Sequence, residues 1–110
     1  MAQNLNQSRF EARRLLLDAK LKTICKNLYF QPPENIKMKY PCIVYHRATG
    51  DTQFANNIPY LRRPQYEVTV IDLDPDSPII DEFWKKFPLA RFSRHFTYDN
   101  LNHDSFTLYF

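Results

Sequence analysis

Cys42 and His46 are the two residues whose types come nearest to nucleophilic chemistry. An imidazole activates a thiol only when the two groups share a hydrogen bond. Both residues lie in the strand-like run Pro41–Arg47, where residues four apart are separated by about 13 Å. We therefore predict that Cys42 is a core residue and that His46 lies near a strand end. An enzyme that uses Cys42 or a histidine is the least favoured hypothesis, and no catalytic residue is expected.

The histidines do not form a recognisable metal motif. A structural zinc site needs about four convergent ligands, usually at close sequence spacing. The chain has three histidines, at His46, His95 and His103. Their scatter predicts no metal site. With one glycine in the whole chain, a glycine-rich phosphate cradle is also excluded, and no cofactor is expected.

Asp72, Asp74 and Asp76 alternate like the first ligands of a calcium loop. The twelve-residue calcium pattern also needs a glycine at its sixth position, and this segment lacks it. Pro75 interrupts the run, and Pro78 opens a helical pattern directly afterwards. The segment is therefore predicted to be a turn whose charge favours the start of the next helix.

Arg62, Arg63, Arg91 and Arg94 form a weak basic set with aromatic residues beside it. Arginines interleaved with aromatic rings can hold single-stranded nucleic acid. The net charge is only +3, and acidic residues are spread along the chain, whereas phosphate recognition favours a concentrated patch. A small nucleic-acid-binding module therefore stays open as the alternative function.

The bulk composition fits one small domain with a surplus of rings. The chain has 110 residues, of which 44% are hydrophobic and 15% aromatic. Large rings are enriched at protein interfaces as well as in cores. The candidates for an exposed aromatic patch are Tyr29, Phe30, Tyr60, Tyr98 and Tyr109. The polar N-terminus and the lack of an apolar run of about 20 residues predict a protein made in the cytosol, with no membrane partner.

Hydrophobic spacing predicts the elements that carry these residues. A capping box at Ser8–Glu11 and an apolar stripe predict a helix over 8–26. Ser77 and Pro78 predict the start of a second helix, which Pro88 ends. Strands are expected at 41–47, 66–72, 91–98 and 104–110, with a shorter one possible at 28–30 and a hairpin turn at 99–103. The expected fold is α+β, a mainly antiparallel four-stranded sheet packed with two α-helices.

We expect a single domain over residues 1–110, in which residues 1–7 are flexible and residues 48–65 form a long loop. This loop, or hairpin arm, joins the first two main strands and exceeds an ordinary hairpin connection. Its prolines and asparagines, with Arg62 and Arg63, favour a partly extended arm. Such an arm is expected to be mobile in the free subunit and ordered between subunits.

The succession of these segments resembles the tail-terminator, or tail-completion, proteins of long-tailed bacteriophages. The resemblance covers most of the chain. Its most typical part is the strand YEVTVID followed by an acidic, proline-containing turn and an amphipathic helix. The segments that carry it are RFEARRLLLDAKLKTI, YPCIVYHR, ATGDTQFANNIPYLRRP, QYEVTVIDLDPDSP, IIDEFWKKF and RFSRHFTYDNLNHDSFTLYF.

The resemblance implies a structural protein of the virion, located at the tail–neck junction after synthesis in the host cytoplasm. Its subunits would form a homo-hexameric ring that caps the tail tube, stops its polymerisation and joins it to the head–tail connector. The implied partners are other copies of the chain, the tail tube protein, the connector or neck protein, and DNA that passes through the lumen without sequence-specific binding. Head–tail connector and minor capsid proteins remain neighbouring alternatives.

The resemblance also implies where subunits meet. The loop between the two central strands is the expected contact region. The residues assigned to the subunit or partner interface are Thr52, Phe54, Tyr60, Leu61, Arg62 and Arg63.

Overall fold

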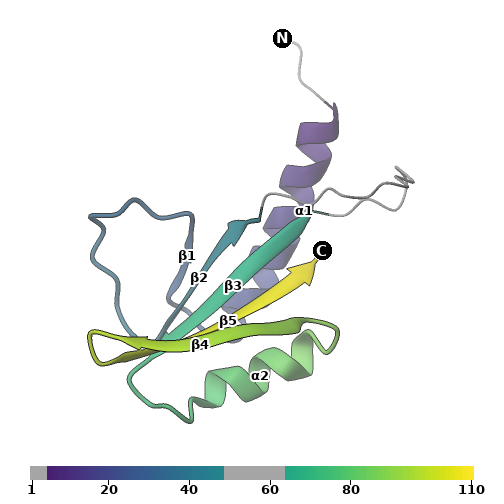
Figure 1. The fold of residues 1–110 in the computed structure, drawn as a ribbon. Coiled ribbons are helices and arrows are strands. Elements are labelled where there is room, and N and C mark those ends of the chain that lie inside the picture. Colours follow the sequence, from purple (N-terminus) through teal and green to yellow (C-terminus); the bar gives the residue numbers. More distant parts are fainter. Residues whose placement is uncertain (1–4, 49–63) are drawn as a thin grey trace.

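The computed structural model describes residues 5–48 and 64–110, with residues 5–10 described by their backbone only. These residues form one sheet and two helices, arranged as in Figure 1. The elements are α1 (Leu5–Lys22), β1 (Leu28–Phe30), β2 (Cys42–Arg47), β3 (Gln65–Asp72), α2 (Pro78–Lys86), β4 (Arg91–Tyr98) and β5 (Leu101–Tyr109). Within these ranges, neither helix is long and apolar enough to cross a bilayer.

The sheet has five strands in the order β1-β2-β3-β5-β4. The α+β class and the two helices are confirmed, but the four-stranded antiparallel sheet is corrected to a five-stranded mixed one. The difference is β1, which pairs with β2 in parallel, while the other neighbouring pairs are antiparallel. Backbone bonds from Ile43 N–H to the Asn27 carbonyl and from Gln31 N–H to the Tyr45 carbonyl fix it there. A strand of only three residues can pair stably here because the residues just before and after it, Asn27 and Gln31, are also hydrogen-bonded to β2.

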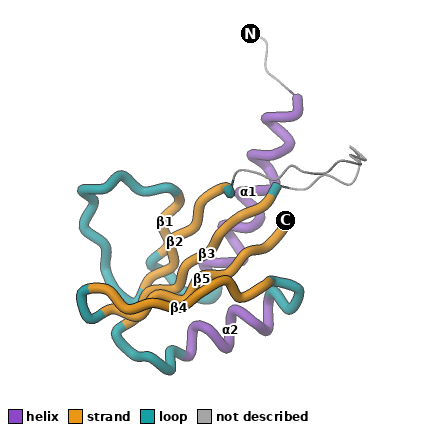
Figure 2. The backbone as a smooth tube through the Cα atoms, viewed as in Figure 1, coloured by secondary structure: helices purple, strands orange, loops and turns teal. Residues whose placement is uncertain are grey.

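One face of the sheet carries the core, and both helices contribute to it. Tyr45, Val68 and Phe106 are neighbours in register across three strands and are fully buried. Leu17 and Leu21 of α1 and Phe83 of α2 belong to the same hydrophobic cluster. We call this side the helix face and the opposite side the outer face. In the tube view of Figure 2, α2 runs beside β4, and α1 lies on the side of β1–β3.

The first helix differs from the prediction at both ends. It begins at Leu5, so Ser8 lies inside the helix and is not its N-cap. Residues such as Leu and Gln extend a helix readily once it has formed. It ends at Lys22 and not at Lys26, because the N–H of Thr23 and that of Ile24 each bond to a carbonyl three residues back and tighten the last turn.

The second helix is confirmed as predicted. The Ser77 hydroxyl accepts a hydrogen bond from the N–H of Ile79, and Pro78 occupies the first turn. Phe83 is fully buried beneath β5, where its ring centroid lies 4.5 Å from that of Phe106. The helix thus packs against the part of the sheet formed by β5 and β4.

The hairpin between β4 and β5 is tighter than predicted. Its turn consists of Asp99 and Asn100 alone, with φ of 58° and 67°. Two central residues with positive φ are typical of a type I′ turn, which matches the twist of the strands it joins. The predicted turn residues 101–103 are instead the first residues of β5.

The predicted loop 48–65 is also shorter. Gln65 is the first residue of β3, and its carbonyl accepts a hydrogen bond from Ala48 N–H. The Pro64 carbonyl accepts one from Phe110 N–H. The sheet ladder therefore continues to the point where the chain leaves at Ala48 and returns at Pro64.

Candidate protein interface

The predicted interface residues cannot be placed in the fold. All of them lie between 49 and 63, outside the described residues: Thr52, Phe54, Tyr60, Leu61, Arg62 and Arg63. Their assignment stays a prediction. Among the described residues, an edge strand of the sheet, β4, carries three exposed aromatic side chains.

Every residue of β4 is exposed. The strand pairs with β5 on one side, and no described residue pairs with its other side. Its aromatic side chains are 52% exposed at Phe92, 39% at Phe96 and 71% at Tyr98. Leu89, just before the strand, is 94% exposed, and Tyr109 on β5 is 58% exposed. Phe92 lies on the helix face and Phe96 and Tyr98 on the outer face, so exposed apolar side chains border the β4 edge on both faces, as they do at partner surfaces.

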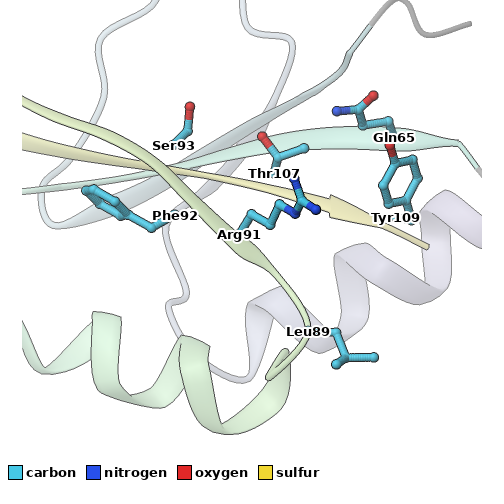
Figure 3. Close-up of a pocket in the computed structure, with 7 residues that line it drawn as sticks. All are labelled: Gln65, Leu89, Arg91, Phe92, Ser93, Thr107 and Tyr109. Atoms are coloured by element: carbon cyan, nitrogen blue, oxygen red, sulfur yellow. The ribbon is translucent and has the colours of Figure 1, made fainter. Parts of the chain in front are cut away.

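A shallow groove of about 550 Å³ lies at the start of β4. Figure 3 shows Arg91, Ser93 and Thr107 around it, with Leu89 at its rim and the side chains of Gln65 and Tyr109 close together. A β-bulge between Phe92 and Arg94 leaves Ser93 without a partner on β5. The groove lining mixes apolar side chains with polar ones: Leu89, Phe92 and Tyr109 beside Gln65, Arg91, Ser93 and Thr107.

The outer face of β4 and β5 carries a stack of flat side chains. The Phe96 ring stacks on the His103 ring at a centroid distance of 4.5 Å and an angle of 14°. The Arg94 guanidinium carbon lies 5.2 Å from the centroid of the same Phe96 ring. Tyr98 lies next along β4 on this face. The predicted basic and aromatic residues of β4 are thus together, but Phe96 already has ring and guanidinium neighbours.

The described structure gives each histidine a local partner. His46 Nε2 lies 3.1 Å from Glu67 Oε1, and His95 Nδ1 lies 2.7 Å from Asp104 Oδ1. His103 Nδ1 lies 3.1 Å from the Leu101 carbonyl oxygen. Among residues 11–48 and 64–110, no group of three potential metal ligands comes together.

Cys42 is fully buried, as predicted, and burial raises the pKa of its thiol to about 12. Cys25 is also buried, and burial raises the pKa of its thiol as well. Both are free thiols. A thiol acts as a nucleophile only as thiolate, so Cys42 is unreactive at neutral pH.

The aspartates of the predicted turn bind the backbone. Asp72 Oδ1 accepts a hydrogen bond from Asp74 N–H at 3.1 Å, and Asp74 Oδ1 accepts one from Asp76 N–H at 2.9 Å. Such side-chain turns are typical of aspartate before a helix. The turn prediction is confirmed.

The prediction of the exposed aromatic patch was right in part. Tyr98 and Tyr109 are exposed, but Phe30 packs against the core beside Tyr45. Phe92 and Phe96 were missed. A signal was present: residues 91–98 contain no aliphatic residue on either side of the alternation, which is unusual for a central strand and typical of an edge.

Comparisons with protein-family models, with curated proteins and with solved structures found no match to this chain.

Proposed function

We propose that this chain is a structural assembly subunit, a tail-terminator or neck protein that forms a ring on a phage tail tube and joins it to the head–tail connector. The role is non-catalytic. The ring, its partners and its place in the virion come from the resemblance of the sequence.

The observation that carries the assembly role, as distinct from the ring itself, is the exposed β4 edge. Monomeric proteins usually protect sheet edges, because unpaired backbone groups invite another strand. Here an eight-residue edge strand carries three exposed aromatic rings, with Leu89 and Tyr109 beside it. A surface of this kind favours a protein that functions in contact with other protein chains. The buried thiols and the locally paired histidines are compatible with a role that needs no reactive group.

The test is the mass of the particle, measured by native mass spectrometry or light scattering with and without tail tube protein. We expect the chain to form a closed oligomer and to bind the end of the tube. A chain that stays monomeric at every concentration and never associates with tails would remove the proposal.

A deletion separates assembly from folding. Because the ladder closes through Ala48 and Gln65, removing residues 52–63 should leave the circular dichroism spectrum and the melting temperature nearly unchanged. The same deletion should impair assembly on the tube. Unfolding of the deleted chain would show that the segment supports the core.

The second candidate, a nucleic-acid-binding module, is favoured by the grouping of Arg91, Arg94 and Tyr98 on one face. Against it, the Phe96 ring already stacks on His103 and lies beside the Arg94 guanidinium, so a stacking base would have to displace one of these neighbours. Glu67 adds a negative charge to the same face. Arg62 and Arg63 lie outside the described residues.

Fluorescence anisotropy with a labelled single-stranded oligonucleotide decides between the two functions. Phosphate contacts would give binding that weakens steeply as salt rises, because counterions are released. We expect no binding even at low salt. Binding that Arg94→Ala abolishes would favour the nucleic-acid function instead.

A further inference from the structure

We propose that β4 is a self-pairing edge: two copies of the chain join their β4 strands antiparallel around a two-fold axis that passes beside Phe96. The two sheets then form one continuous sheet with all helices on the same side. This inference goes beyond the ring and does not depend on the tail-assembly role.

The β4 edge has only part of the usual protection of an edge strand, namely two arginines and one β-bulge near its start. Natural edges are shortened, covered, or interrupted by lysine or proline. The β4 sequence RFSRHFTY contains neither residue. Its one irregularity, the bulge between Phe92 and Arg94, leaves Arg94–Tyr98 as a regular edge.

The turn fixes which backbone groups point away from the sheet. In a two-residue hairpin the flanking residues, here Tyr98 and Leu101, form a hydrogen-bonded pair. Pairs then alternate along the ladder, so Phe96 and Arg94 also bond to β5. The backbone N–H and C=O groups of His95 and Thr97 therefore point away from β5, in the plane of the sheet, toward its open edge.

This pattern complements itself when Phe96 lies opposite its own copy. His95 of one chain then faces Thr97 of the other, and each such pair exchanges two backbone hydrogen bonds. Phe96 opposite Phe96, and Arg94 opposite Tyr98, form pairs without backbone bonds, where side chains approach most closely. A ring pair and two cation–π pairs line the outer face, with no like charges opposed.

Neighbouring registers fit less well. Antiparallel partners must share a face, so the axis can move only from one residue to the next along β4. An axis at Arg94 opposes two guanidinium groups, and one at His95 brings the bulge into the ladder. An axis at Thr97 places His95 against Asp99 of the turn. Only the axis at Phe96 uses the whole regular edge.

The first test removes an outward N–H from the full-length chain and leaves the pairing with β5 intact. Thr97→Pro deletes that donor, and an edge strand tolerates proline at an outward position. Thr97→Val, the matched control, keeps the donor and the side-chain shape. Sedimentation equilibrium over a concentration series should show a dimer that Thr97→Pro weakens at least about tenfold relative to Thr97→Val. Circular dichroism should show both variants folded.

Equal dimerisation of the two folded variants would overturn the proposal, as would a parent chain that is monomeric throughout. If Thr97→Pro does not fold, Phe96→Asp decides instead: it places two carboxylates opposite each other at the axis and should abolish the dimer. A dimer that survives Phe96→Asp overturns the proposal.

The second test reads the register. At the axis, Cα atoms of a pair without backbone bonds lie about 4.5 Å apart, within the range that a disulfide spans. Phe96→Cys should therefore form a disulfide-linked dimer on mild oxidation, while Thr97→Cys, which faces His95 across the axis, should not. The native thiols of Cys25 and Cys42 are buried. Crosslinking of Thr97→Cys in preference to Phe96→Cys would overturn the register.

The dimer and the ring are separable in the same experiments. A two-fold contact closes on itself, so it yields a pair, and a ring needs contacts elsewhere. A chain that dimerises through β4 but never binds tail tubes would overturn the proposed function alone. A chain that forms rings but fails both β4 tests would overturn the edge pairing alone.

Discussion

The two edges of the sheet, β1 and β4, differ in how they are held and what they expose. β1 has three half-buried residues, and its ends are fastened by neighbouring backbone. The Arg14 guanidinium lies 4.4 Å from the Phe30 centroid, and the Tyr29 hydroxyl accepts a hydrogen bond from Lys39 N–H. β4 has eight exposed residues, whose backbone partners among the described residues lie on β5 alone.

The comparison shows that one sheet can have an edge that contacts other parts of the same chain and an edge that is free to pair with another chain. On the β1 side, the edge strand is short and half-buried, and side chains or backbone of α1 and of the following loop contact its rings. On the β4 side, α2 packs on β5 through Phe83 and Phe106 and thus supports β4 through its neighbour, while no described residue pairs with the free edge of β4. An edge that is firmly supported and uncovered is suited to pair with another chain.

The support of β4 through α2 gives the largest expected effect. Phe83 is fully buried and contacts the rings of Phe87 and Phe106. Phe83→Ala should lower the free energy of unfolding by about 3–5 kcal/mol, since it leaves a cavity beneath β5. Urea denaturation measures the loss.

Phe92→Ala is the control for that variant, because Phe92 contacts the same Phe106 ring from an exposed position. It should cost much less. A loss below about 1 kcal/mol for Phe83→Ala would contradict the support of β4 by α2.

The same contrast explains what could be predicted from the sequence. The α2 helix and β3 follow from local signals: a serine cap, a proline in the first turn, and a strict two-residue alternation. β1 was predicted only as a possible short strand, because three residues are too few to show an alternation of apolar and polar side chains. Its hydrogen bonds to β2, which is distant in the sequence, make it a strand. The exposed β4 edge was missed because alternation shows two faces but does not say which strands have neighbours on both sides.

The β1–β2 side should be the more sensitive to alkaline pH. Burial raises the pKa of Cys42 from 9.0 to about 12, so the folded state holds a proton that the unfolded chain releases. This stability is fully present below pH 9 and is lost as pH rises toward 12, by up to about 1.4 kcal/mol per pH unit. The loss at pH 11 is then roughly 2–3 kcal/mol.

Cys42→Ala removes the titrating group and is the variant to compare. Urea denaturation from pH 8 to 11 should show a shallower loss than in the parent chain, from a slightly lower starting stability. Parallel pH profiles of the two proteins would contradict this account of Cys42.

A matched pair of truncations compares the edges directly. Phe30 on β1 packs on Tyr45 at 4.8 Å between centroids, whereas Phe96 on β4 packs on His103 at the surface. Phe30→Ala should cost about 2 kcal/mol of unfolding free energy, below the value for a fully buried ring. Phe96→Ala should cost less than about 1 kcal/mol. Equal losses, measured by urea denaturation at a concentration where the chain is monomeric, would remove the distinction between the edges.

Two neighbouring buried tyrosines, Tyr45 on β2 and Tyr66 on β3, differ in whether their hydroxyl groups are hydrogen-bonded. Tyr45 donates a hydrogen bond to Asp18 Oδ2 at 2.7 Å, and burial followed by this bond raises its pKa. The Tyr66 hydroxyl is buried and has no hydrogen-bond partner among the described residues, although the two rings lie only 6.1 Å apart. An unpaired buried hydroxyl costs free energy that a satisfied one does not.

Replacing each tyrosine by phenylalanine separates the two cases, since both changes remove one oxygen from neighbouring sites in one core. Tyr45→Phe should lower the free energy of unfolding by about 1–2 kcal/mol, because it deprives a carboxylate of its donor. Tyr66→Phe should leave stability unchanged or raise it by up to about 1 kcal/mol, because no described bond is lost and a desolvated hydroxyl is removed. Thermal melts of the two variants beside the parent chain measure the difference. A Tyr66→Phe variant as unstable as Tyr45→Phe would mean that the Tyr66 hydroxyl has a hydrogen-bond partner after all, and the two tyrosines would then not differ.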